Sequence, residues 1–115
     1  MRWLLVLLLV GCGGEGGPRV RVDGRSVWLE GEAPVRGVQL ELAWDEGLVV
    51  SSVEPGADVA RLDLVRAKLR EDRRGARVVV ADTRGVAVPA RAELVHVIGA
   101  GEGTLRVVDV RVVPR

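Results

Sequence analysis

From residue 19 onward the chain alternates between apolar and polar side chains. The clearest alternation runs from Val38 to Trp44, where valine, leucine and tryptophan occupy every second position. A period of two places neighbouring side chains on opposite faces of a β-strand. We therefore expect one face of this strand to be buried, with Trp44 in the core.

Turn signals rich in glycine, proline and aspartate divide the rest of the chain into similar short segments. The expected strands are 19–22, 27–32, 38–44, 48–53, a strand beginning near 64, 77–81, 92–98 and 105–113. A short edge piece is expected at Val86 and Val88, limited by Pro89 because proline cannot donate to a sheet. No segment predicts a helix longer than a few turns. We therefore expect an all-β fold, a single antiparallel β-sandwich domain over 19–115.

Residues 57–70 allow two interpretations. Asp58 is able to cap a short helix with one apolar side. Alternatively, the segment contains a strand that turns Val65, Ala67 and Leu69 inward. We favour a turn to about Asp63 followed by a strand.

The composition narrows the classes of function. The 115 residues contain 17 Lys and Arg against 16 Asp and Glu, which argues against nucleic acid as a partner. One Cys excludes an internal disulfide and one His excludes a multi-His metal site. Phe and Tyr are absent, so the core is predicted to be aliphatic and rich in valine. We expect no cofactor, no metal and no catalytic residues.

The first residues have the pattern of a secretory signal. Arg2 precedes an apolar run over 3–10, which is too short to span a membrane at about 20 residues per crossing. The sequence that follows, Leu9-Val10-Gly11-Cys12, resembles a bacterial lipobox. This resemblance implies cleavage of a signal peptide over 1–11 and a diacylglyceryl group on Cys12.

Two other interpretations of this start are an ordinary signal peptide with an incidental Cys, and a buried N-terminal strand. Under the lipoprotein interpretation, residues 12–18 form the lipidated Cys and a Gly-rich tether, which reaches at most about 25 Å. The protein is then expected in the bacterial cell envelope, anchored to a membrane outside the cytoplasm. Gly13 replaces the Asp that the lipoprotein family uses for inner-membrane retention, which favours the outer membrane where there are two.

The body of the chain resembles a cohesin-type domain. The resemblance rests on four stretches, 35–56 with the pair Trp44-Asp45, 77–83, 93–98 and 105–110. Trp44 replaces the commoner Tyr of that family, and His96 stands where Phe is frequent. The resemblance implies a nine-stranded jelly-roll sandwich, a fold shared with several carbohydrate-binding modules. Cellulosomal cohesins bind a protein partner, the dockerin, through one sheet face, and no fixed interface motif carries over to this chain.

The candidate chemistry is sparse. His96 has no nucleophile partner by motif, and a strand rather than a helix follows Gly99-x-Gly101-x-Gly103, which therefore predicts a hairpin turn and not a phosphate loop. Trp28 lies out of phase with Val27 and Leu29, and an outward Trp is able to contact a sugar ring. We expect a non-catalytic, lipid-anchored domain that holds an envelope protein through a sheet face. The alternative is a polysaccharide-binding module.

Overall fold

The computed structural model describes residues 17–115, which form strands and turns without a helix. The predicted signal peptide, lipobox and Cys12 lie outside the described residues. Eight strands follow one another along the chain: β1 (Arg19–Asp23), β2 (Ser26–Glu30), β3 (Val35–Trp44), β4 (Leu48–Pro55), β5 (Leu64–Leu69), β6 (Gly75–Ala81), β7 (Arg91–Gly101) and β8 (Leu105–Pro114).

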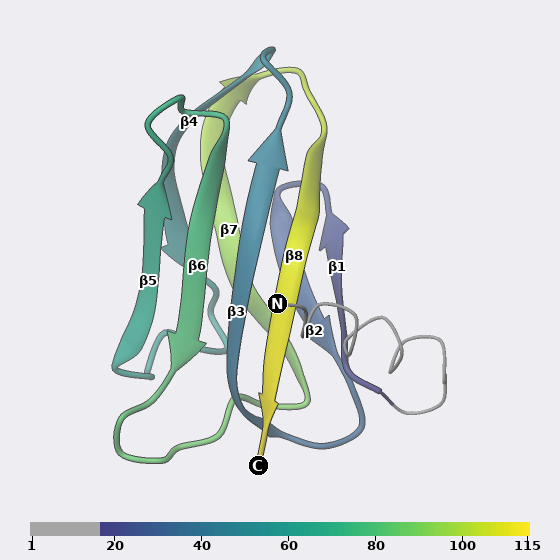
Figure 1. Ribbon diagram of the computed structural model, residues 1–115, viewed down its shortest axis with the longest axis vertical. Coiled ribbons are helices and arrows are strands. Elements are labelled where there is room, and N and C mark those ends of the chain that lie inside the picture. The colour runs from purple at the N-terminus through teal and green to yellow at the C-terminus, as the bar shows by residue number, and fades with distance from the viewer. Residues whose placement is uncertain (1–16) are drawn as a thin grey trace.

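The strands form two four-stranded sheets that pack face to face (Figure 1). Sheet A has the order β1-β2-β7-β4 and sheet B has the order β5-β6-β3-β8. Every ladder is antiparallel. The predicted antiparallel β-sandwich is therefore confirmed.

The strands pair from the two ends of the described chain inward. β2 pairs with β7 and β3 pairs with β6, while β1 approaches β8 and β4 approaches β5 where the two sheets meet. Pairing the first strand with the last, and so on inward, is the jelly-roll arrangement. It brings the turns after β1, β3, β5 and β7 to one end of the sandwich and those after β2, β4 and β6 to the other (Figure 1). The described chain begins and ends at this second end.

The inner faces of the sheets enclose a core of valine, leucine and alanine. Trp44 is its one buried aromatic side chain among residues 17–115, with 2% of its surface exposed, as the alternation predicted. Its indole Nε1 donates a hydrogen bond of 2.9 Å to the carbonyl of Arg73 in the turn between β5 and β6. Trp44 thus fills the core and fastens this turn to the end of β3.

Residues 57–70 follow the favoured interpretation, turns followed by a strand. Val59 and Leu62 are buried beneath the turns and hold them against the core. In β5, Val65 and Leu69 pack against the core, whereas Ala67 between them is exposed on this edge strand. The register of Ala67 with the buried Val78 places Ala67 on the inner face as predicted, although its position on an edge strand leaves it exposed.

Two other boundaries differ from the prediction. β7 continues through Gly99 to Gly101, so the turn before β8 is shorter than the Gly-rich loop that the sequence indicated. Gly99 is required there because a side chain would collide with the backbone carbonyl of Val49 on the neighbouring strand. Val88 forms an isolated bridge with Val35 and is fully buried, so the segment adds no edge strand of its own.

A buried carboxylate locks the loops at the end where the described chain begins. Asp82, whose side chain is inaccessible to solvent, accepts hydrogen bonds from the Asp63 and Arg84 N–H groups and from the Arg84 guanidinium. The hydrogen bond from the Arg84 side chain is the main reason that the pKa of Asp82 lies far below its usual value of 3.8. The Thr83 hydroxyl and N–H donate to Asp63 in turn, which lowers the pKa of Asp63. The loops after β4 and β6 are therefore joined through ionised groups.

Candidate functional site

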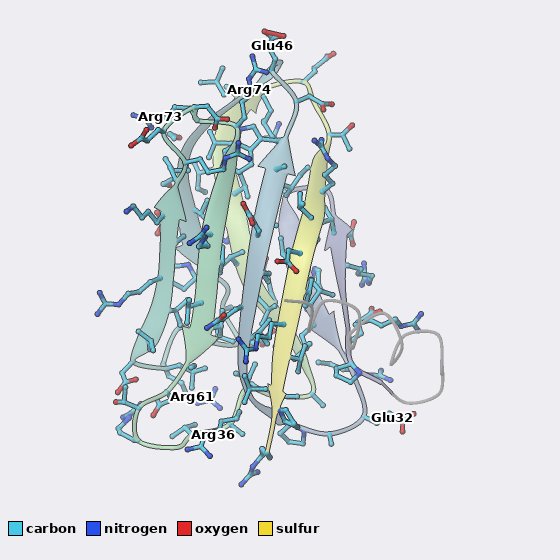
Figure 2. All side chains as sticks on the ribbon, in the orientation of Figure 1. Glu32, Arg36, Glu46, Arg61, Arg73 and Arg74 are labelled. Carbon is cyan, nitrogen blue, oxygen red and sulfur yellow. The ribbon has the colours of Figure 1, made fainter. Side chains whose placement is uncertain are left out.

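The two outer faces of the sandwich are the main candidates for a binding site, because the longest loops, those after β4 and β6, are tied together by the hydrogen bonds of Asp63 and Asp82. Figure 2 shows Glu46, Arg73 and Arg74 at one end and Arg36 and Arg61 at the opposite end. Arg74 and Glu46 form an exposed ion pair of 3.1 Å. Exposed pairs of this kind are typical of solvated turns and contribute little.

Sheet B carries five basic side chains against two acidic ones on its outward strand positions. They are Arg66, Lys68, Arg77, Arg106 and Arg111, with Glu41 and Asp109. The outward positions of β5 and β6 hold no acidic residue. Because Arg106 forms an ion pair of 3.3 Å with Asp45 in the turn after β3, the excess of positive charge on this face lies mainly on β5 and β6.

Four of these charges form a line across sheet B, which we call the charged row. Lys68 of β5 lies opposite Arg77 of β6, Arg77 lies opposite Glu41 of β3, and Glu41 lies opposite Asp109 of β8. Residues directly opposite on antiparallel strands have Cβ atoms about 5 Å apart. The row therefore crosses all four strands without a gap.

None of the four side chains of the charged row forms an ion pair or a side-chain hydrogen bond within residues 17–115. Lys68 faces another cation and Glu41 faces another carboxylate, and like charges directly opposite on a sheet are destabilising. Asp109 Oδ1 is also buried without a hydrogen-bond partner. A buried acceptor left unsatisfied has a free-energy cost that a ligand donor removes.

The surface over the charged row is hollowed. One hollow of about 620 Å³ is lined by Lys68, Arg77 and Glu41 together with Leu69 and the turn after β5. A second hollow of about 240 Å³ is lined by Glu41, Arg77 and Asp109, with residues 39–40. The two hollows share Glu41 and Arg77, so they adjoin along the row.

Sheet A differs in how its outer charges are held. Arg21 of β1 forms ion pairs with Glu30 and Asp23, and its hydrogen bond to Glu30 lowers the pKa of that carboxyl. Glu93 of β7 accepts a hydrogen bond of 2.6 Å from the Ser26 hydroxyl. These charges are satisfied within the sheet itself.

Trp28 lies on this outer face of sheet A, half-buried, where the sequence pattern indicated that it faces outward. Its partners in register are Arg21 and Glu93, the same two side chains that already bind neighbours on the sheet. The outer face of sheet A thus presents one Trp among polar groups that are already engaged.

His96 is also on the outer face of sheet A, with Ser26 and Glu54 as its register partners. It therefore lies on the opposite side of the sandwich from the carboxylates Glu41 and Asp109. Residues 17–115 contain no group of three or more His, Cys, Asp or Glu side chains placed to hold a metal ion. No helix in this same range is long and apolar enough to cross a membrane.

The charged row could not be recognised from the sequence pattern, which singled out Trp28 as the candidate contact. Its members are far apart in the chain, and only the register of β5, β6, β3 and β8 aligns them. The signal that was present is the alternation within each strand, since Arg66 and Lys68 share one face of β5 and Gln39 and Glu41 share one face of β3.

No protein-family model matches the chain, and comparison with curated proteins and with solved structures likewise found no match.

Proposed function

We propose that the protein is a non-catalytic binding domain of the bacterial cell envelope that holds a protein partner on the outer face of sheet B. A lipid on Cys12 anchors it to a membrane, the outer one in an envelope with two membranes. The proposal needs no cofactor and assigns no catalytic residue.

The unsatisfied charged row is the observation that carries the proposal. Charges that serve only solubility are free to spread apart or to pair, as Arg21, Glu30 and Glu93 do on sheet A. The charged row instead keeps two like-charge contacts and a buried, unpartnered oxygen of Asp109. Surfaces selected for binding retain such groups at the expense of stability, because the partner supplies the missing contacts.

The lipobox and the tether support the placement in the envelope. A tether over 12–18 keeps the domain within about 25 Å of the lipid surface. Each buried methylene of the lipid contributes about 0.8 kcal/mol, so a Cys12 with two or more chains stays attached. The tether joins the domain at the start of β1, which is an edge strand of sheet A.

A cohesin-like assignment agrees with the jelly-roll order of the strands. Cohesins have nine strands, whereas residues 17–115 contain eight. The fold alone does not specify a partner, so the choice of a protein partner rests on the charged row and not on the resemblance.

The test places a photoreactive amino acid at Val79 on sheet B or at Ile98 on sheet A in the full-length chain. Both are aliphatic outward residues on an inner strand of their sheet. We expect protein adducts in intact cells from Val79 and none from Ile98. A Cys12→Ala variant should remain unprocessed and carry no lipid label. Adducts from Ile98 alone, or from neither position, contradict the proposed function.

The second candidate function is polysaccharide binding through Trp28. Its half-exposed indole beside Arg21 and Glu93 favours it, since sugar sites combine an aromatic ring with polar groups. Two observations count against polysaccharide binding: Arg21 and Glu93 already bind neighbouring side chains, and the outer face of sheet A presents one Trp only among the described residues. A screen of envelope polysaccharides with the full-length chain tests this candidate. Saturable polysaccharide binding that Trp28→Ala removes, together with the absence of protein adducts at Val79, would favour polysaccharide binding over protein binding.

A further inference from the structure

The charges of the charged row are segregated by sign. Reading across the sheet from β5 to β8, the row is basic at Lys68 and Arg77 and then acidic at Glu41 and Asp109. Neighbouring strands are about 4.8 Å apart, so the centres of the basic and acidic halves are about 10 Å apart. The row therefore has a direction, perpendicular to the strands.

We propose, on the basis of the proposed function, that the charged row selects its partner by this order of charge. The partner is a protein surface with two acidic side chains facing Lys68 and Arg77. About 10 Å further along, it carries two basic side chains facing Glu41 and Asp109. The hollow beside Glu41 and Arg77 admits the ends of these side chains, and a basic group there supplies the donor that Asp109 Oδ1 lacks.

The two signs in one row exclude a simpler partner. A uniformly anionic polymer is attracted to Lys68 and Arg77, but across the row it meets the carboxylates of Glu41 and Asp109. Proteins place opposite charges a few ångströms apart, whereas a phosphate or uronate polymer carries one sign throughout. The row therefore favours a protein over an acidic polysaccharide.

A second copy of this chain fits the row but not the rest of the face. A two-fold axis parallel to the strands, between β6 and β3, sets the basic half of one row against the acidic half of the other. The same operation sets Arg66 against Arg111 of the second copy, because these residues lie at the two ends of the neighbouring row. Both faces also carry the excess of basic residues, so a self-complex is repelled.

Helical peptides are suitable probes, because a helix pitch of 5.4 Å is close to the spacing of the strands. An Ala-rich peptide with Glu, Glu, Lys and Lys at positions i, i+4, i+7 and i+11 has the blocked order. A control peptide with Glu, Lys, Glu and Lys at the same positions has the same composition and net charge. A third peptide with four Glu residues stands for a polyanion. Reversing the blocked order is not a control, since a helix can lie in either direction.

The experiment measures the affinity of each labelled peptide for the full-length chain in detergent at low ionic strength, where surface charges are weakly screened. The blocked peptide is expected to bind about tenfold more tightly than the alternating one, since two of four contacts become repulsive in the latter. Arg77→Glu combined with Glu41→Arg converts the row to alternating order without changing its charge. This variant is expected to prefer the alternating peptide.

A second variant protects the test against misfolding of the first. Lys68→Glu with Asp109→Lys gives an alternating row through the edge strands β5 and β8 and is expected to show the same inverted preference. Equal affinities for the blocked and alternating peptides, tighter binding of the four-Glu peptide, absence of binding, or a dimer that these variants abolish each overturns the proposal. If Val79 still forms protein adducts in cells, the proposed function remains and only the order of charge fails.

Discussion

The outer faces of the two sheets carry similar numbers of charged side chains but hold them in different ways. On sheet A, Arg21 pairs with Glu30 and Asp23, and Glu93 binds Ser26. On sheet B, the charged row has no internal partner and two of its contacts join like charges. The comparison shows that two faces of similar charge content differ in how far their charges are paired, and this difference is the basis on which sheet B is proposed as the binding face.

The largest expected effect is on partner capture. Lys68→Glu with Arg77→Glu makes the whole charged row acidic and should weaken protein capture at Val79 by about 30-fold or more, because two attractive contacts become repulsive. The matched control is Arg19→Glu with Arg91→Glu, which reverses two exposed charges on sheet A. Quantified adduct yields check the difference, and equal losses in both variants contradict a special role for sheet B.

The next effect concerns the scaffold beneath both faces. In the wild type, the backbone N–H groups of Asp63 and Arg84 donate to the Asp82 carboxylate. Asp82→Asn replaces one carboxylate oxygen by an amide NH₂ group, which cannot accept these hydrogen bonds, and should lower Tm by about 10 °C at neutral pH. The folded pKa of Asp82 is depressed, so its contribution is complete above the unfolded value of 3.8 and is lost as the pH falls below it.

The Tm gap between wild type and Asp82→Asn is therefore expected to narrow as the pH falls from about 5 to about 2. Thermal melts followed by circular dichroism measure this gap. A gap of constant size across that pH range shows that the ionised form of Asp82 is not what stabilises the loops.

A smaller effect distinguishes the internally bonded charges of sheet A. Glu93→Ala removes the acceptor of the Ser26 hydroxyl and of the Ala57 N–H, and should lower Tm by about 5 °C. The same measurement on Glu41→Ala, in the charged row, should show no loss of stability. Equal destabilisation by the two variants would remove the contrast between the faces.

The smallest effect has the opposite sign. Asp109→Asn removes the repulsion between Asp109 and Glu41 and should raise Tm by about 1–4 °C while weakening partner capture. Parallel melts and adduct yields of this variant test whether stability and binding are in conflict at this position. A fall in both quantities indicates a structural role for Asp109 instead.

The sequence predicted the strands, the turns and the β-sandwich class of this fold well, because alternation of side chains and turn residues are local signals. The burial of Trp44, the turns before β5 and most strand boundaries follow from them. The exposure of Ala67 and the length of β7 could not be predicted in this way. The exposure of Ala67 depends on β5 being an edge strand, and the extension to Gly101 depends on the close approach of β4.

The candidate site was less predictable than the fold. Each member of the charged row is an ordinary outward residue in its own strand, and only the pairing of β3 with both β6 and β8 brings Glu41 between Arg77 and Asp109. Pairing between strands that are distant in the chain is a property of tertiary structure. Trp28 was easier to single out because its residue type is unusual in this chain.

The most direct test of the central claim is carbodiimide labelling of carboxylates on the full-length chain, first purified in detergent and then in native membranes. If a partner covers sheet B, Glu41 and Asp109 are protected in the membranes, whereas Glu54 on the outer face of sheet A reacts equally in both samples. Equal labelling of Glu41 and Asp109 in the two samples, or protection of Glu54 alone, contradicts the claim.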